Sequence, residues 1–459
     1  MEKTKLFSLA VLSLLSFQSY GYIQVLHPQE LRDKLGSDGL IVSSLGNFGH
    51  ITYGASILGR LHYPKSNRKG CNDFTDEDFA NDFLYDEDTD LTPIVIVDRG
   101  DCTFVTKVRN IEKLGVKLAI IVDDREEYSE NLIMADDGTG HSINIPSFMV
   151  RKRDGNIIKD TIINNNSKKV YLKAELEINH PDNRVEYELW YSSILDLDYM
   201  QLRELALYQF ALGKDALFTP RVLTYACPEC SAEMKAKQCF ANGQYCPYLP
   251  KIKQDQIDSS VNSNYTQWFN YALNFIDNCA DTGRFTEQCS REVMGQVNVN
   301  ADKVINCVKE SFTNPNNFKE SSENRILKED RKWSQQIGII LHPQISINNI
   351  TYRGDINGYD VFRAVCAGFK DQPKVCKGDN IFDVIEGQDS QLIVSTRRHL
   401  AKIVHIIGAV VVVLALNFLA LCLYRRYAKK KMNEELAVQV NSAVSQYFKL
   451  SGQDSREYE

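Results

Sequence analysis

Residues 91–122 read LTPIVIVDRGDCTFVTKVRNIEKLGVKLAIIV. The β-branched run from Leu91 to Val97 predicts a buried strand, the segment from Val105 to Leu114 predicts a helix, and the run from Lys117 to Val122 predicts a second buried strand. This strand-helix-strand unit lies within a longer region, from Tyr22 to about His180, whose pattern alternates strands and helices. The stretch therefore predicts an α/β domain at the start of the chain.

The turn between the first strand and the helix carries the most specific motif. It reads Val97-Asp98-Arg99-Gly100-Asp101-Cys102-Thr103-Phe104 and is followed by Lys107, Asn110, Gly115 and Ile120-Ile121-Val122-Asp123-Asp124. In this order the residues resemble the protease-associated domain, and Ile145 to Val150 looks like that family's next strand. The resemblance implies a domain that binds rather than catalyses.

The same turn is the candidate binding site. A helix N-terminus offers backbone N–H donors, and with Arg99 beside it the turn suits a peptide carboxylate or carbonyl. In the sorting-receptor branch of the family the matching loop binds cargo peptides, which implies a site at Arg99, Gly100, Asp101, Cys102, Thr103 and Phe104, and more loosely at Met134 to Gly138. The alternative is that Arg99 pairs with a carboxylate of its own domain.

Composition excludes several classes of protein. Of the 459 residues 25% are charged and 43% hydrophobic, and the net charge is −7, so the chain is neither disordered nor collagen-like, and nucleic acid is not an expected partner. A mean hydropathy of −0.31 excludes a polytopic membrane protein. The chain is expected to be globular with one membrane anchor.

The two ends predict the topology. Lys3 and Lys5 precede an apolar run from Leu6 to Phe17, and Ser19 and Gly21 place small residues before a cleavage site, as in a secretory signal peptide. The uncharged run from Ile403 to Tyr424 is long enough to cross a bilayer. The basic cluster that follows places the tail in the cytosol, and its members are Arg425, Arg426, Lys429, Lys430 and Lys431. These features predict a type I membrane protein.

The cysteines then lie almost entirely in an oxidising compartment. Of 12 cysteines only Cys422 lies in the predicted span, so disulfides are expected. Cys71 and Cys102 are the only cysteines of the first domain and are expected to pair, two unpaired buried thiols being the alternative. Cys366 and Cys376 are close in sequence and are also expected to pair. The number left in the central region is odd, and Cys230 is the first candidate for a thiol without a partner there.

The central region predicts a thioredoxin-like domain. Arg184 to Trp190 predicts a strand, Leu195 to Leu212 an amphipathic helix, and Arg221 to Ala226 a strand that runs into Cys227-Pro228-Glu229-Cys230. His342-Pro343, followed by an Asn-rich turn, resembles the cis-proline loop of thioredoxin-like folds. A mostly helical insert separates the two.

The order of these elements resembles one family, the vacuolar sorting receptors. The matching segments are His180-Pro181-Asp182, Arg184 to Glu188, Thr219-Pro220, Cys227-Pro228-Glu229, Gln238-Cys239, Gly243 to Cys246, Asp302-Lys303-Val304, Cys307, Tyr352-Arg353-Gly354 and Val365 to Phe369. Two departures stand out. No cysteine lies between Lys377 and the span, so the family's epidermal-growth-factor-like repeats and their calcium-binding role are missing, and Cys230 lies outside the family pattern.

The resemblance implies a cargo receptor that carries soluble proteins, hydrolase precursors among them, from the Golgi to a vacuole, lysosome or endosomal organelle. It implies no catalysed reaction and no cofactor, and the carboxylates between Asp73 and Asp90 match no EF-hand calcium loop, so no metal is expected. The alternative is a membrane-bound thiol-disulfide oxidoreductase with Cys227 as nucleophile and Cys230 as resolving thiol, unless these cysteines form structural bridges elsewhere.

Shorter signals complete the expectations. Tyr447-Phe448-Lys449-Leu450 matches a Tyr-x-x-Φ sorting motif for a clathrin adaptor, the alternative being an amphipathic helix from Glu434 to Leu450. Glycosylation sequons begin at Asn165, Asn264 and Asn349, and His141 and His180 are candidates for a pH response. The expected parts are a signal peptide (1–21), a protease-associated domain (22–180), a cysteine-rich thioredoxin-like domain with helical insert (181–380), a juxtamembrane linker (381–402), a transmembrane helix (403–424) and a cytosolic tail (425–459).

Overall fold

The computed structural model describes residues 21–79, 91–126, 133–164, 169–247, 265–317, 321, 323–378, 381–392 and 396–451. The chain forms two compact units, one reaching to Val394 and one from Ser395 onward. The apolar run of the predicted signal peptide and the sequons at Asn165 and Asn264 lie outside the described residues.

An eight-stranded mixed sheet forms the first domain, in the order β2-β1-β8-β4-β5-β6-β7-β3. Its strands are β1 (Tyr22–His27), β2 (Leu40–Ile41), β3 (Ser43–Leu45), β4 (Ser56–His62), β5 (Thr92–Asp98), β6 (Ala119–Val122), β7 (Ser147–Val150) and β8 (Val170–Glu175). Strands β4 to β7 run parallel, so the predicted strand-helix-strand unit is confirmed as β5, α2 (Phe104–Glu112) and β6.

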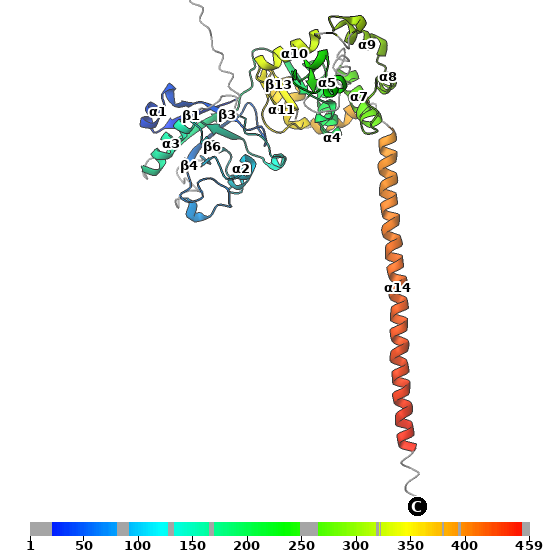
Figure 1. Cartoon of the computed structure of the whole chain (residues 1–459). Helices are drawn as coiled ribbons and strands as arrows, with labels where there is room; N and C mark the ends of the chain where they lie inside the picture. The colour runs from blue at the N-terminus through cyan, green and yellow to red at the C-terminus, as the bar shows by residue number, and fades with distance from the viewer. Residues whose placement is uncertain are drawn as a thin grey trace, which may run out of the picture. The chain divides into compact units, whose positions relative to one another are not determined.

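Helices cover both faces of this sheet. Ile94 and Ile96 of β5 belong to one apolar cluster with Ile158 of α3 (Lys152–Asn164). The alternate residues of β5 pack on the other face against α2, where Val105 and Val108 are fully buried. Figure 1 shows α2 and α3 on opposite sides of β6, and α1 (Gln29–Leu35) contacts α3. Because both faces are covered, the central strands are continuously apolar.

A four-stranded sheet in the order β10-β9-β13-β14 forms the second domain. Its strands are β9 (Val185–Tyr191), β10 (Ala216–Val222), β13 (Gln344–Ile347) and β14 (Ile350–Thr351). Two helices, α4 (Tyr199–Leu212) and α11 (Gly358–Ala367), pack against each other beside the sheet. The predicted mixed fold, a protease-associated domain followed by a thioredoxin-like domain, is confirmed.

The insert between β10 and β13 is mostly helical where it is described, as predicted. It contains α5 (Ala232–Gln238), α7 (Tyr265–Phe275), α8 (Glu287–Gln296), α9 (Ala301–Glu310) and α10 (Arg325–Gln336), with a small sheet of β11 (Thr224–Tyr225) and β12 (Cys246–Pro247). Two further helices, α12 (Lys374–Lys377) and α13 (Ile381–Gln388), follow α11.

Two predicted boundaries were wrong. The strand expected from Arg221 to Ala226 is β10, which begins at Ala216 because it pairs with β9 from Ala216 opposite Val185 onward. Proline is tolerated at Pro220 because β10 lies at the sheet edge. The helix expected from Leu195 begins at Tyr199 because the Asp198 side chain caps it, accepting a hydrogen bond from the Gln201 N–H at 2.8 Å.

The segment around Cys227 has the expected order of strand, Cys-x-x-Cys and helix, but the strand before it is not the one that the cis-proline loop faces. The His342–Pro343 peptide bond is cis, and His342 Nδ1 lies 2.9 Å from the Asp196 carboxylate, which follows the inner strand β9. The Cys-x-x-Cys segment instead follows edge strand β10 and then β11, and it precedes α5, whose N-cap is Ser231. The cis-proline loop thus meets the end of β9, whereas the cysteines follow a different strand.

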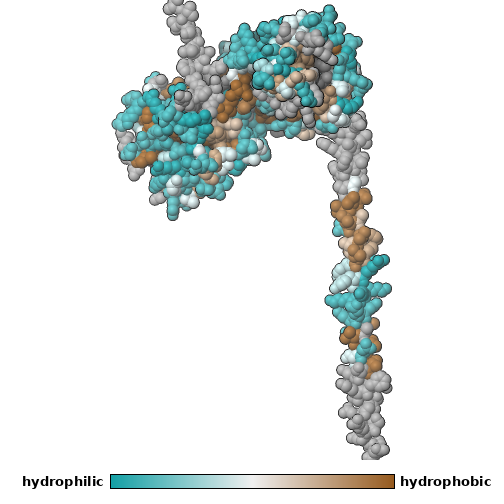
Figure 2. Space-filling view, in the orientation of Figure 1, coloured by the Kyte–Doolittle hydropathy of each residue, from teal (hydrophilic) through white to brown (hydrophobic). Residues whose placement is uncertain are grey.

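The second unit is dominated by α14 (Thr396–Ser451). By length and composition, residues 410–444 of this helix form one candidate membrane span among the described residues. Figure 2 shows a hydrophobic segment of α14 followed by a hydrophilic one, which corresponds to the basic residues after Tyr424.

Candidate functional site

The candidate loop connects β5 to α2. Gly100 has φ +112° and Asp101 has φ +68°, so two successive residues adopt left-handed backbone. Thr103 then caps α2, its hydroxyl accepting a hydrogen bond from the Thr106 N–H at 3.1 Å. The sequence thus fixes a sharp reversal of the backbone directly before the helix.

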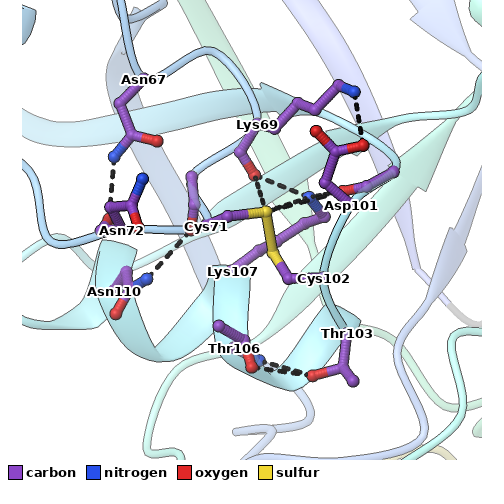
Figure 3. The surroundings of a disulfide bond; sticks show 12 residues. Asn67, Lys69, Cys71, Asn72, Asp101, Cys102, Thr103, Thr106, Lys107 and Asn110 are labelled. Atoms are coloured by element: carbon purple, nitrogen blue, oxygen red, sulfur yellow. Dashed lines mark hydrogen bonds and ion pairs between the residues drawn. A yellow bond between two sulfur atoms is a disulfide. The ribbon is translucent and has the colours of Figure 1, made fainter.

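A disulfide between Cys71 and Cys102 joins this loop to residues 67–72, the alternative of two free thiols being absent (Figure 3). Lys69 of the second loop forms an ion pair with Asp101 at 2.7 Å. The hydrogen bond from Lys69 lowers the pKa of the Asp101 carboxyl, which stays exposed. An anionic side chain therefore lies at the surface of the loop.

Arg99 has domain carboxylates as partners, as the alternative interpretation expected. Its guanidinium lies 2.7 Å from the fully buried Asp123 and 3.4 Å from the exposed Asp124. It also lies over the Phe104 ring, with its central carbon 5.5 Å from the ring centre. Because Arg99 is the closer of the two arginines that face the buried Asp123 charge, neutralising it is the first role of Arg99.

The segment from Met134 to Gly138 contributes only in part. Met134 is fully buried in the core beneath α2 and cannot contact a ligand. Asp137 does reach the loop, since its carboxylate accepts a hydrogen bond from the Thr103 hydroxyl at 2.6 Å. That bond and one from Thr139 lower the pKa of Asp137.

Chemically, the loop offers a main-chain donor, the Asp101 N–H. Among the described residues, no hydrogen bond occupies the Asp101 N–H, and that of Cys102 is bonded within the loop to the Gly100 oxygen at 2.9 Å. Within the same described ranges, no group of three His, Cys, Asp or Glu residues could hold a metal ion.

The cysteines of the second domain confirm the predicted Cys366–Cys376 bridge but contradict the expectation for Cys230. Cys230 is not the unpaired cysteine: it is bonded to Cys227, and the other bridges are Cys239–Cys246, Cys279–Cys289 and Cys366–Cys376. The exposed Cys307 on α9 is the free thiol, together with Cys422 of α14. Neighbouring cysteines close short loops here, which leaves the more distant Cys307 without a partner.

The structure adds a histidine that sequence reasoning missed. His141 and His180 are both exposed, and the His180 ring has the Ile178 carbonyl as a neighbour at 2.9 Å. His50 instead lies 2.6 Å from the buried Asp360 carboxylate of α11, across 310 residues of sequence. No local pattern signals a contact of such separation.

The predicted glycosylation site at Asn349 lies in a turn, and the predicted sorting motif lies in a helix. Asn349 is exposed in the turn between β13 and β14, with φ +66°. Tyr447 and Leu450 lie on the helical backbone of α14. The helical alternative for the tail therefore describes this part of the structure.

Comparison with known proteins supports both domains. The PA domain family model matches residues 57–158, and the vacuolar sorting receptor thioredoxin-like domain model matches residues 256–366. The vacuolar-sorting receptor 1 of Pisum sativum is 28% identical over 404 residues, which cover 78% of this chain and 61% of the relative. The vacuolar-sorting receptor 2 of Arabidopsis thaliana is also 28% identical, with the same two coverages.

The chain spans about three fifths of the length of these relatives. A structural match to a zinc aminopeptidase of Bacillus subtilis, 12% identical in sequence, covers 77% of this chain and 82% of the aminopeptidase chain. Its TM-score is 0.24. The sequence relatives and the thioredoxin-like domain model point to the same family. The chain is similar in sequence to the vacuolar-sorting receptors and matches the family models of the PA domain and of their thioredoxin-like domain.

Proposed function

We propose that this protein is a type I transmembrane receptor that sorts soluble cargo, hydrolase precursors among them, from the Golgi to a vacuole, lysosome or related endosomal organelle. The observation that carries the proposal is the similarity to proteins named vacuolar-sorting receptors, and the exposed loop from Arg99 to Phe104 is the site that we assign to cargo. No catalytic role is proposed.

The topology belongs to the same proposal. Residues 1–21 are removed as a signal peptide, 22–180 and 181–380 form the two lumenal domains, and 381–402 link them to a span at 403–424. The tail, 425–459, binds a clathrin adaptor through Tyr447 and Leu450, and the receptor cycles between the Golgi, trans-Golgi network and endosomal or prevacuolar membranes. The apolar segment of α14 and its basic flank support this orientation.

Cargo binding is tested with the lumenal unit, residues 22–394, which is compact on its own. A pool of randomised dodecapeptides is passed over the immobilised unit, and bound peptides are identified by mass spectrometry. We expect a defined set to be enriched on the native unit and lost with Arg99→Ala. Because that change leaves Asp123 buried without its closest counter-ion, the double variant Arg99→Ala/Asp123→Asn serves as a stable counterpart.

Arg125→Ala is the matched control, since Arg125 also faces Asp123 but at 3.8 Å and with a more exposed side chain. Enrichment should survive this change. If neither Arg99 variant changed peptide capture, the loop would not be part of the binding site. If the native unit enriched no peptide, that result would argue against a cargo receptor.

A further inference from the structure

Lys107 on α2 is a lysine whose side chain is fully buried. Its ammonium donates hydrogen bonds to the carbonyl oxygens of Gly100, at 2.6 Å, and of Lys69, at 2.7 Å. It also lies 3.4 Å from Cys71 Sγ, beside the disulfide (Figure 3). The Lys107 ammonium thus connects the candidate loop to residues 67–72, next to the disulfide that links the same two segments.

The bond to Gly100 fixes the direction of one peptide group. Since a trans peptide is planar, its carbonyl and the following N–H point to opposite sides. The Gly100 carbonyl points inward to the ammonium, so the Asp101 N–H points away from it. Reversal of this peptide group would break a charge-assisted hydrogen bond.

Packing alone does not explain a lysine here. Burying an ammonium costs free energy that an apolar side chain of similar length would avoid. Burial lowers the pKa of Lys107 to about 8, while the facing carboxylates of Asp101 and Asp98 raise it and the Lys69 ammonium lowers it. In a neutral or acidic compartment the side chain therefore keeps its charge, and the two carbonyls are held by a cation.

We propose that Lys107 is the positioning residue of the cargo site: it holds the Gly100 carbonyl inward and so presents the Asp101 N–H to a carbonyl or carboxylate oxygen of an extended peptide. This inference rests on the proposed function. Lys107 does not touch the ligand and acts through the backbone of the loop.

Asn110, one turn further along α2, provides a matched control. It is also buried, but its amide donates to the Gly70 carbonyl at 3.1 Å and makes no contact with Gly100. Lys107→Met and Asn110→Leu each remove a buried donor to the loop at residues 67–72. Only the first removes a donor from the Gly100 carbonyl, which then keeps the Cys102 N–H alone.

Two measurements on the lumenal unit distinguish the variants. Hydrogen exchange of residues 99–104 needs no ligand, and we expect Lys107→Met to accelerate it at least about tenfold while Asn110→Leu leaves it unchanged. The affinity for the most enriched dodecapeptide of the pool above, labelled with fluorescein, should fall about tenfold or more with Lys107→Met and less than about threefold with Asn110→Leu.

The pH profile separates positioning from general stability. Peptide affinity of the native unit and of Asn110→Leu should weaken between pH 7 and pH 9 as Lys107 loses its proton, whereas that of Lys107→Met should stay flat. Equal affinity losses in the two variants, or unchanged exchange in Lys107→Met, would overturn the inference while leaving the cargo site in place. Absence of any enriched peptide on the native unit would overturn the inference and the proposed function together.

Discussion

Asp330 is a single carboxylate whose environment changes its chemistry. It is buried on α10, 2.8 Å from the Arg221 guanidinium of β10, and it also faces the backbone N–H of Val222. Burial raises the pKa of Asp330 to about 6, although the Arg221 partner opposes the rise. The native state therefore binds a proton more tightly than the unfolded state, in which an aspartate has a pKa near 3.8.

The contribution of Asp330 to the unfolding free energy should consequently increase as pH falls from about 7 to about 4. The reason is that native Asp330 binds more protons across that range than Asp330 of the unfolded state does. With Asp330→Asn this contribution, on the order of 2 to 3 kcal/mol, should disappear. Urea unfolding of the lumenal unit at several pH values measures it. Asp302→Asn is the control, because Asp302 is an exposed carboxylate that also pairs with an arginine, and its loss should leave the slope intact.

Cys307 makes a prediction about thiol content. The structure pairs every lumenal cysteine except Cys307, which is exposed on α9. Denatured, unreduced lumenal unit should therefore react with one equivalent of a thiol reagent, and Cys307→Ser should react with none. Three reactive equivalents in the native sequence, or two in the variant, would show that one of the five bridges is absent.

At the scale of elements, α14 combines a candidate membrane span with the predicted sorting motif. Its backbone stays helical through Tyr447 to Ser451, whereas a Tyr-x-x-Φ peptide binds in an extended conformation. The last turns of a helix lack tertiary contacts of their own and open at low cost. The proposed adaptor binding would thus require local unwinding of this end of the helix.

Tyr447→Ala and Leu450→Ala should each weaken binding of a tail peptide, residues 425–459, to the medium subunit of a clathrin adaptor by about tenfold or more, because each anchor would fill its own pocket. Tyr427→Ala is the control, since Tyr427 lies on the same helix nearer the span and is exposed. Isothermal titration gives the affinities. Unchanged binding in both motif variants would assign adaptor recognition to another part of the tail.

At the scale of the whole lumenal unit, the two domains share a buried junction. The Tyr53 and Tyr352 rings pack at 5.5 Å, and the Tyr53 hydroxyl donates to the Arg353 carbonyl at 3.1 Å. Beside them His50 is bonded to Asp360, which raises the pKa of the histidine, and the nearby Arg363 partly opposes that rise. The junction therefore contains a histidine whose protonated form is favoured by its contact with Asp360.

The raised pKa means that this junction is strongest at acidic pH and loses the His50 contribution as pH rises through the folded-state pKa. Hydrogen exchange at residues 49–54 and 352–360 should accordingly be slower, relative to intrinsic rates, at pH 5 than at pH 7.5. With His50→Gln this pH dependence should vanish, while the exposed-site control His180→Gln should retain it. Equal pH dependence in the two variants would contradict the role of His50.

Much of the molecule follows from its sequence. Hydrophobic runs are local, so the pattern from Leu91 to Val122 predicts β5, α2 and β6, and the apolar run before Arg425 predicts a span. The turn motif located the candidate loop for the same reason. The number of cysteines in the central region is odd, so at least one of them has no partner in that region. This conclusion follows from the sequence alone.

Only the tertiary structure decided which groups meet. Cys230 pairs with Cys227 and leaves Cys307 free, Arg99 neutralises Asp123, and His50 reaches Asp360 across the sequence. Each of these depends on how distant segments close on one another, which local periodicity does not encode. Lys107 illustrates both cases. The spacing of apolar residues predicts its helix, but the burial of its side chain next to the Gly100 carbonyl follows from the packing of α2 against two loops.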